Sequence, residues 1–130
     1  MNEVKYKVVN SEEAQNVLLG CGIYPTKKGY NYLLAAIEIF RGPTHNLCDL
    51  YKQVANIFQV TPASVERCIR TCINEAFYTS SFMYLNKFFR SDIFKQNTYL
   101  SSGDFIGIIA TYLDIIDAPA MKWIPTDTKE

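Results

Sequence analysis

The sequence lacks the long apolar runs and the N-terminal features that direct proteins into or across membranes. No run approaches the roughly 18 to 20 apolar residues of a membrane span. The first 15 residues include Glu3, Glu12 and Glu13 and do not resemble a secretory signal. With 130 residues, 48% of them hydrophobic, the chain has enough apolar material for one core. We therefore predict one cytoplasmic domain over residues 1–130, with residues 1–9 and 117–130 as tails.

The residue combinations that enzymes need are also missing. The single histidine, His45, lies in a predicted loop beside Pro43, and no acid or nucleophile stands near it in a catalytic pattern. No glycine-rich loop that could cradle a phosphate occurs. We predict that the protein is not an enzyme and uses no cofactor.

The four cysteines form no CxxC pair. Cys68 and Cys72 fall on the apolar side of a predicted helix, where a thiol behaves as a small hydrophobic group. Reduced core thiols and no metal site are therefore predicted. The alternative is a zinc site in which His45 and Cys48 join Cys68 and Cys72, which lie four apart on one helical face.

The chain has no excess charge of either sign, which is unusual for a free-standing DNA-binding domain. The distribution is uneven, however. Residues 51–95 hold six basic and three acidic side chains, a net charge of +3, whereas residues 96–130 hold two basic and five acidic ones, a net charge of −3. The middle of the chain could therefore face a polyanion.

Apolar residues recur at helical spacing along most of the chain, and no segment requires a strand. Asn10 and Glu13 form a capping-box-like start, and Gly20 provides a stop for the first helix. An all-α fold of about six helices is predicted. The helices are expected at Asn10–Leu19, Lys27–Arg41, Leu47–Phe58, Pro62–Phe77, Phe82–Phe89 with a continuation toward Phe94, and Ser102–Ile116.

The third and fourth of these helices have the pattern of a helix-turn-helix. Thr61 supplies a capping hydroxyl, and Pro62 fits the first helical turn because its missing N–H costs nothing there. Ala55 is the small residue needed where the helices cross, and Gln59 stands where many such turns have glycine, so a conformation that a side chain tolerates is expected. The angle between the helices is expected to be filled by Val54, Phe58, Val60, Val65 and Cys68. The alternative is an ordinary helical hairpin packed into an all-α core.

The fourth helix separates an apolar stripe from a polar one. The residues expected to face outward are Ala63, Ser64, Glu66, Arg67, Arg70, Thr71 and Asn74, and on the polar face of the third helix Asp49, Lys52, Gln53 and Asn56. We predict that DNA is contacted by Ser64, Glu66, Arg67, Arg70, Thr71, Asn74 and Lys52. An exposed helical face with a weak Glu66–Arg70 ion pair at i, i+4 spacing is the alternative.

These segments resemble one family, the C-terminal effector domain of the stage-zero sporulation protein A, the response regulator of sporulation initiation. The resemblance covers about Ala14 to Ile116. It is carried by Lys28-Gly29-Tyr30, Tyr32-Leu33 and Ala36-Ile37, by Leu50-Tyr51, Val54-Ala55 and Phe58, by Val65-Glu66-Arg67 with Ile69-Arg70, Ile73 and Ala76, and by Phe105-Ile106. The VER-x-IR segment is its most specific part.

The resemblance implies a six-helix, response-regulator effector domain, broadly like a winged helix but with no wing required. Its recognition helix would enter the major groove of a promoter element, with Glu66 and Arg67 reading bases and Arg70 near a phosphate or base. The chemistry suits these roles, since arginine donates to guanine O6 and N7 and a carboxylate accepts from cytosine N4.

The chain departs from the family pattern in two ways. Only about 13 residues precede the segment that resembles the family, where the family has a receiver domain, so we expect control other than phosphorylation within this chain. Ser64, Thr71, Asn97 and Tyr99 stand where the family usually has basic-type residues. Each such loss removes attraction to phosphate.

Two functions from different classes remain open at the level of the sequence. The first is a transcriptional regulator that binds double-stranded DNA, as a monomer or as a homodimer on paired half-sites. The second is a protein-interaction or adaptor module that keeps the fold but binds a related regulator or another protein. The apolar tail residues Met121, Trp123 and Ile124 could dock on such a partner or pack against the last helix.

Overall fold

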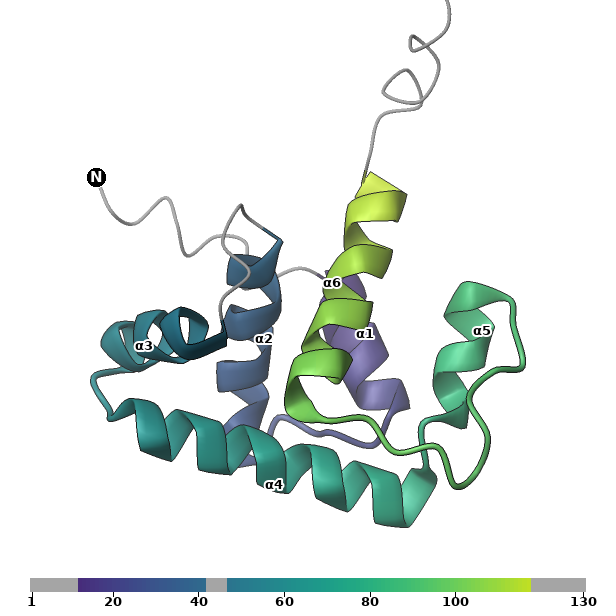
Figure 1. Ribbon diagram of the computed structural model, residues 1–130, viewed down its shortest axis with the longest axis horizontal. Helices are drawn as coiled ribbons and strands as arrows, with labels where there is room; N and C mark the ends of the chain where they lie inside the picture. Colours follow the sequence, from purple (N-terminus) through teal and green to yellow (C-terminus); the bar gives the residue numbers. More distant parts are fainter. Residues whose placement is uncertain (1–11, 42–46, 118–130) are drawn as a thin grey trace, which may run out of the picture.

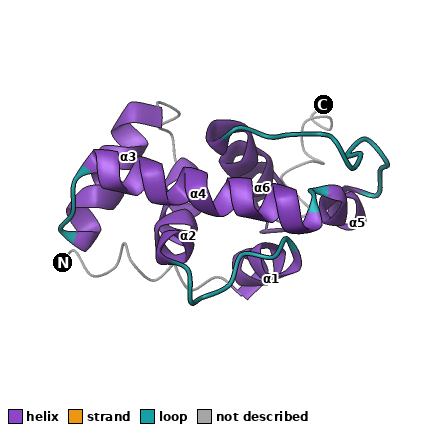
Figure 2. Ribbon diagram, turned by 90° about the horizontal axis from the view of Figure 1, so that it is seen from below, coloured by secondary structure: helices purple, strands orange, loops and turns teal. Residues whose placement is uncertain are grey.

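The computed structural model describes residues 12–41 and 47–117, and these residues form an all-α domain without strands (Figures 1 and 2). The elements in chain order are α1 (Glu12–Gly20), α2 (Lys28–Phe40), α3 (Leu47–Phe58), α4 (Pro62–Ser80), the 3-10 turn η2 (Met83–Leu85), α5 (Asn86–Phe89) and α6 (Ser102–Asp117). The predicted fold class is confirmed. The proposed cap at Asn10 and the predicted tail 1–9 lie outside the described residues. The predicted tail 117–130 also lies outside them, apart from Asp117, which ends α6.

Helix α2 is the centre of the domain. It packs against α1, α3, α4 and α6, and its side chains from Tyr32 to Glu38 are all buried. A helix that is apolar on nearly every side must be covered on nearly every side. Glu38 is the one charged residue in this run, and its carboxylate accepts from Arg41 Nη1 at 3.3 Å while Arg41 Nε reaches Asp114 Oδ1 on α6 at 2.9 Å.

Helices α3 and α4 form the predicted pair joined by a sharp turn. The Thr61 hydroxyl accepts the Ser64 N–H at 3.1 Å, and Pro62 is the first helical residue, as expected. Two details of the turn were predicted wrongly. Gln59 adopts a left-handed backbone with φ of 59°, and Val60, expected to fill the angle, is 36% exposed. Of the other residues expected to fill the angle, Val54 and Val65 are fully buried, and Phe58 and Cys68 are half-buried.

Helix α4 extends one turn beyond the predicted end at Phe77, because no helix breaker precedes Ser81, which leaves the helix with φ of 59°. The next helix does not continue toward Phe94. Arg90 takes a left-handed conformation with φ of 49° and ends α5. Phe94 is fixed instead by the Asn86 side chain. Asn86 Nδ2 donates to the Phe94 carbonyl at 2.9 Å, and Asn86 Oδ1 accepts from the Phe94 N–H at 3.1 Å.

The cysteines have different surroundings. Cys21 and Cys72 are buried free thiols, Cys68 is half-buried rather than a core residue, and Cys48 is exposed. In the described part of the chain no three histidine, cysteine or acidic side chains cluster as metal ligands; His45 lies outside it. Every helix within residues 12–41 and 47–117 is too short or too polar to cross a bilayer.

Candidate nucleic-acid interface

The outward side of α4 is the exposed edge of the helix pair. Seen from below in Figure 2, α4 crosses in front of α2 and α6, so none of the other described helices covers its outer side. Val65, Ile69, Cys72, Ile73 and Ala76 anchor its inner side in the core. The outward set predicted from the sequence is found there: Ala63, Arg67, Arg70 and Thr71 are exposed, and Ser64, Glu66 and Asn74 are half-buried.

Glu66 and Arg70 form an ion pair on this surface. Arg70 Nη1 donates to Glu66 Oε2 across one helical turn, and the two side chains keep 48% (Arg70) and 38% (Glu66) of their surface exposed. The hydrogen bond to Glu66 raises the pKa of the Arg70 guanidinium, a group that is charged even without this bond. The pair predicted as the alternative to base reading is therefore present in the free domain.

Tyr51 of α3 lies close enough to this pair for both charges to act on its phenol. Its side chain is 9% exposed, and burial raises the pKa of its phenol, with a smaller raising effect from the nearby Glu66 carboxylate. A bond to Ser102, at the start of α6, acts in the opposite direction. The phenol therefore stays neutral and marks the point where α3, α4 and α6 meet.

Asn74 is tied to a part of the chain far away in sequence. The Tyr99 hydroxyl donates to Asn74 Oδ1 at 2.6 Å, and the Tyr99 ring packs edge-on against Phe77 with centroids 5.3 Å apart. The loop before α6 thus contacts the outward side of α4 at its middle. With its carbonyl oxygen engaged, Asn74 has its amide N–H groups left as the donors for an external acceptor.

Lys52 lies on α3, on the other side of the turn. It is exposed and lines a hollow of about 450 Å³ between the two helices, together with Gln53, Ala55, Asn56, Val60 and Pro62. The exposed Val60 forms part of this wall rather than of the core. The predicted contact residues therefore come from both helices and flank the turn.

The matching family model, described as sporulation initiation factor Spo0A C terminal, covers residues 14–113, and so includes most of α1, all of α2 to α5 and most of α6. The chain belongs to this family. The predicted resemblance is confirmed over nearly the range expected from the sequence. Spo0A C-terminal domains are DNA-binding regulatory domains and not enzymes, so the chain is a DNA-binding transcription-regulator domain in that general sense.

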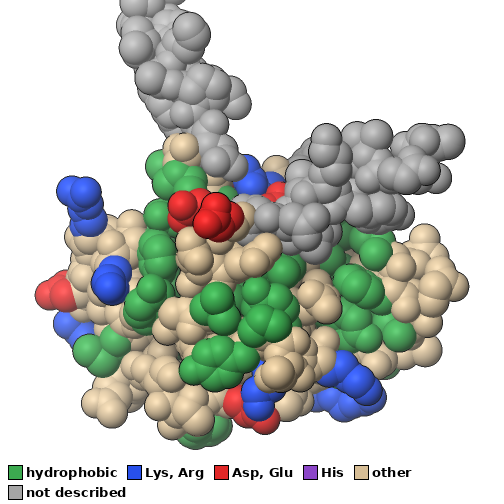
Figure 3. All heavy atoms as spheres, turned by 180° about the vertical axis from the view of Figure 1, so that it is seen from behind, with side chains coloured by type: hydrophobic (Ala, Val, Ile, Leu, Met, Phe, Trp, Pro, Cys, Tyr) green, Lys and Arg blue, Asp and Glu red, His purple; other side chains and the backbone are tan. Residues whose placement is uncertain are grey.

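Basic side chains of this Spo0A-type domain are spread thinly. Figure 3 shows the face opposite to that of Figure 1, with Lys and Arg groups along the lower edge and at the side of the domain, and hydrophobic groups between them. Several cations already have partners: Lys27 Nζ lies 3.0 Å from Glu75 Oε1, and Arg70 pairs with Glu66. On the described part of the interface, Arg67 and Lys52 are the exposed cations for which no acidic partner is seen.

Sequence reasoning missed Tyr51 and Tyr99 as supports of the interface. Tyr51 was assigned only to the apolar side of its helix, and its electrostatic interaction with Glu66 and Arg70 depends on how closely α3 crosses α4. Tyr99 was noted only as a position where the family usually has a basic residue. No local sequence pattern predicts the hydrogen bond between residues 74 and 99, because this bond depends on the path of the loop before α6.

Proposed function

We propose that this domain regulates transcription by placing the N-terminal half of α4 in the major groove of duplex DNA. The observation that supports the proposal best is the exposed polar side of a long, well-capped helix that no other described helix covers. The diameter of one helix fits the major groove, and a fixed N-terminus positions the residues that follow it.

Arg67 is the base reader in this proposal. Its guanidinium is exposed and lies one turn into α4, where it can donate two bonds to guanine O6 and N7. Glu66 accepts from cytosine N4, and Arg70 offsets the repulsion between that carboxylate and the phosphates. Ser64, Thr71, Asn74 and Lys52 donate to the backbone and set the position of the helix.

The test compares Arg67→Ala with Lys87→Ala at one salt concentration. Both variants lose one positive charge, but Lys87 lies on α5, outside the interface, so it is the matched control. The duplex is first selected from a random pool with the wild-type domain. Arg67→Ala should lose about 1–3 kcal/mol of preference for that duplex over a scrambled one, while Lys87→Ala keeps the preference. Equal preference in wild type and Arg67→Ala would refute base reading by this residue.

We also propose that two copies bind paired half-sites. The interface of one domain offers few cations, so a second domain on the same duplex would supply the affinity that one lacks. The selected sequences should then contain two copies of the element with centres about 10–10.5 base pairs apart or a multiple of that. A single unrepeated element would contradict the dimer.

An adaptor function is the second candidate, and the observation that favours it is the neutral chain with its partly neutralised interface. Selection from the random pool at two salt concentrations separates the candidates. If no sequence is enriched at either concentration, DNA reading fails and binding to a protein partner becomes the better explanation.

A further inference from the structure

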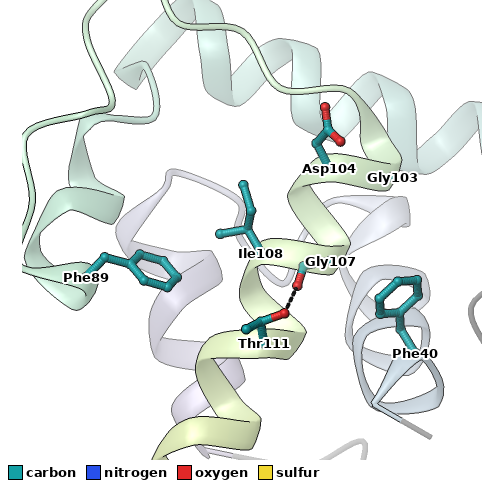
Figure 4. A pocket seen from close by; sticks show the side chains of 7 residues that line it. All are labelled: Phe40, Phe89, Gly103, Asp104, Gly107, Ile108 and Thr111. Atoms are coloured by element: carbon teal, nitrogen blue, oxygen red, sulfur yellow. Dashed lines mark hydrogen bonds between the residues drawn. The ribbon is translucent and has the colours of Figure 1, made fainter. Parts of the chain in front are cut away.

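A second hollow lies along α6, and no residue of α4 lines it. It has a volume of about 450 Å³ and is lined by Phe40, Phe89, Gly103, Asp104, Gly107, Ile108 and Thr111. Figure 4 shows Phe89 of α5 on one side of α6 and Phe40 of α2 on the other. We call this hollow the α6 groove. Its size is within the range of sites that enclose a small organic group.

Two glycines make the groove. Gly103 and Gly107 lie one turn apart and carry no side chain, and Thr111 follows one turn later with its hydroxyl bonded to the Gly107 carbonyl at 2.8 Å. A Cβ added at Gly107 would meet the Phe40 ring only at 3.7 Å, so the space beside it is open. The floor of the groove therefore consists of small residues, and its walls carry aromatic and aliphatic side chains.

Apolar exposure continues along α6 toward its end. Ile115 is 55% and Ile116 is 42% exposed, although the rest of the helix is strongly apolar and packs into the core. Together with the apolar lining of the groove they extend one apolar surface along α6, the kind of surface that a further segment covers.

The chain that follows α6 has the composition and the reach to do so. Pro119 disfavours a helical conformation at residue 118, which fits the end of α6 at Asp117. The next residues include Met121, Trp123 and Ile124. Ten residues of helix from Gly107 to Asp117 span about 15 Å, and the six residues from Asp117 to Trp123 reach about 20 Å when extended.

We propose that the segment Met121–Ile124 turns back along α6 and places the Trp123 indole in the α6 groove. Charge favours this direction of docking. Lys122 lies in the segment, and Asp104 is an exposed carboxylate on the groove wall, whereas the other nearby acid, Asp114, is already bonded to Arg41. The occupant is thus the chain itself, and this inference does not depend on DNA binding.

Trp123 is the only tryptophan of the chain, so its fluorescence reports the docking directly. In the full chain without DNA, its emission should be blue-shifted relative to N-acetyltryptophanamide, and acrylamide should quench it several-fold less effectively. Both values should be the same over a wide range of protein concentration, since the contact is within one molecule.

Thr111→Arg puts a long charged side chain into the groove and should shift the emission to that of a water-exposed indole. Thr79→Arg is the matched control, because Thr79 is also an exposed helical threonine whose hydroxyl bonds the carbonyl four residues earlier, but on α4. This control should leave the emission unchanged, and far-ultraviolet circular dichroism should show equal helix content in both variants.

Nuclear Overhauser contacts between the indole and the methyl groups of Ile108 and Thr111 in the unaltered protein provide a measurement that needs no variant. Their presence supports the docking. An indole that is fully quenchable in the unaltered protein would overturn the proposal. So would a blue shift that appears only at high protein concentration, because that result indicates a second copy as the occupant.

Discussion

Gln59 illustrates how one residue carries the strain of the turn between α3 and α4. Its φ of 59° places a side chain in the left-handed region, where residues other than glycine pay about 1–2 kcal/mol. The Gln59 side chain offsets little of this cost, because it makes one exposed hydrogen bond, from Nε2 to the Asn56 carbonyl at 2.9 Å. The turn therefore keeps the geometry that glycine gives elsewhere, but without glycine.

We predict that Gln59→Gly raises the free energy of unfolding by about 0.5–1 kcal/mol, because relief of strain exceeds the extra chain entropy of glycine in the unfolded state. Gln59→Ala keeps the strained backbone and loses the side-chain bond, so it should not stabilise the domain. Urea unfolding of the three proteins measures the differences. A glycine variant less stable than the wild type would show that the turn is not strained.

Cys21 is the residue from which a pH dependence follows most directly. Its side chain is fully buried, and burial raises the pKa of the thiol from 9.0 to about 12. Below pH 9 the thiol is neutral in both the folded and the unfolded chain, so it does not make stability depend on pH. Between pH 9 and pH 12 only the unfolded chain ionises, and this pulls the equilibrium toward unfolding.

We predict that Cys21 accounts for a loss of about 1.4 kcal/mol in the free energy of unfolding between pH 7 and pH 10, since one pKa unit corresponds to about that amount. Cys21→Ala is less stable at pH 7 because of the cavity it leaves, but its loss between the two pH values should be smaller than that of the wild type by this amount. Urea unfolding at both pH values gives the comparison. Equal losses would mean that the thiol ionises at its ordinary pKa in the folded state.

At the scale of the elements, the crossing of α2 and α4 decides where the candidate interface lies. Gly29 permits this crossing, because a Cβ there would come within 2.5 Å of the Cys68 carbonyl oxygen and 2.7 Å of the Cys72 sulphur. The first of these is backbone and cannot rotate away. Helix packing thus explains why glycine stands in the Lys28-Gly29-Tyr30 segment, which carries part of the family resemblance.

We predict that Gly29→Ala destabilises the domain by about 1–3 kcal/mol, the usual range for overpacking, despite the better helix propensity of alanine. Asn31→Ala is the matched control, because Asn31 lies inside the same helix as Gly29 but is exposed. This control should stabilise by up to about 0.7 kcal/mol through helix propensity alone. Thermal unfolding of both variants tests the pair, and a shift of the same sign in both would contradict the packing argument.

The elements were largely predictable because their signals are local. Thr61 and Pro62 placed the start of α4 correctly, and the apolar stripe from Val65 to Ala76 placed its buried side. The end of α4 was missed, since Tyr78, Thr79 and Ser80 neither favour nor forbid helix strongly. The supports of the interface were not predictable at all: the Tyr99–Asn74 bond joins residues 25 positions apart, and only the folded loop brings them together.

At the scale of the whole molecule, neutrality constrains the way DNA can be bound. The chain carries 13 basic and 13 acidic residues, so no broad attraction to a polyanion adds to the local contacts. Arg70 already forms an ion pair with Glu66 on α4, and Lys27 forms one with Glu75. The affinity for DNA must therefore come from a few side chains. The slope of its salt dependence measures how many phosphates they neutralise.

We predict that one domain bound to its selected duplex has a shallow salt dependence. If Lys52 and Arg70 contact phosphates while Arg67 reads a base, the slope of log K against log salt should be about −2, at roughly −0.9 for each neutralised phosphate. Lys52→Ala should reduce the steepness by about one unit while keeping the preference for the selected duplex, whereas Lys87→Ala should change neither. Fluorescence anisotropy titrations at four salt concentrations measure the slopes. A slope steeper than about −6 would require more phosphate contacts than this surface can make with one duplex, and would locate the DNA on another face.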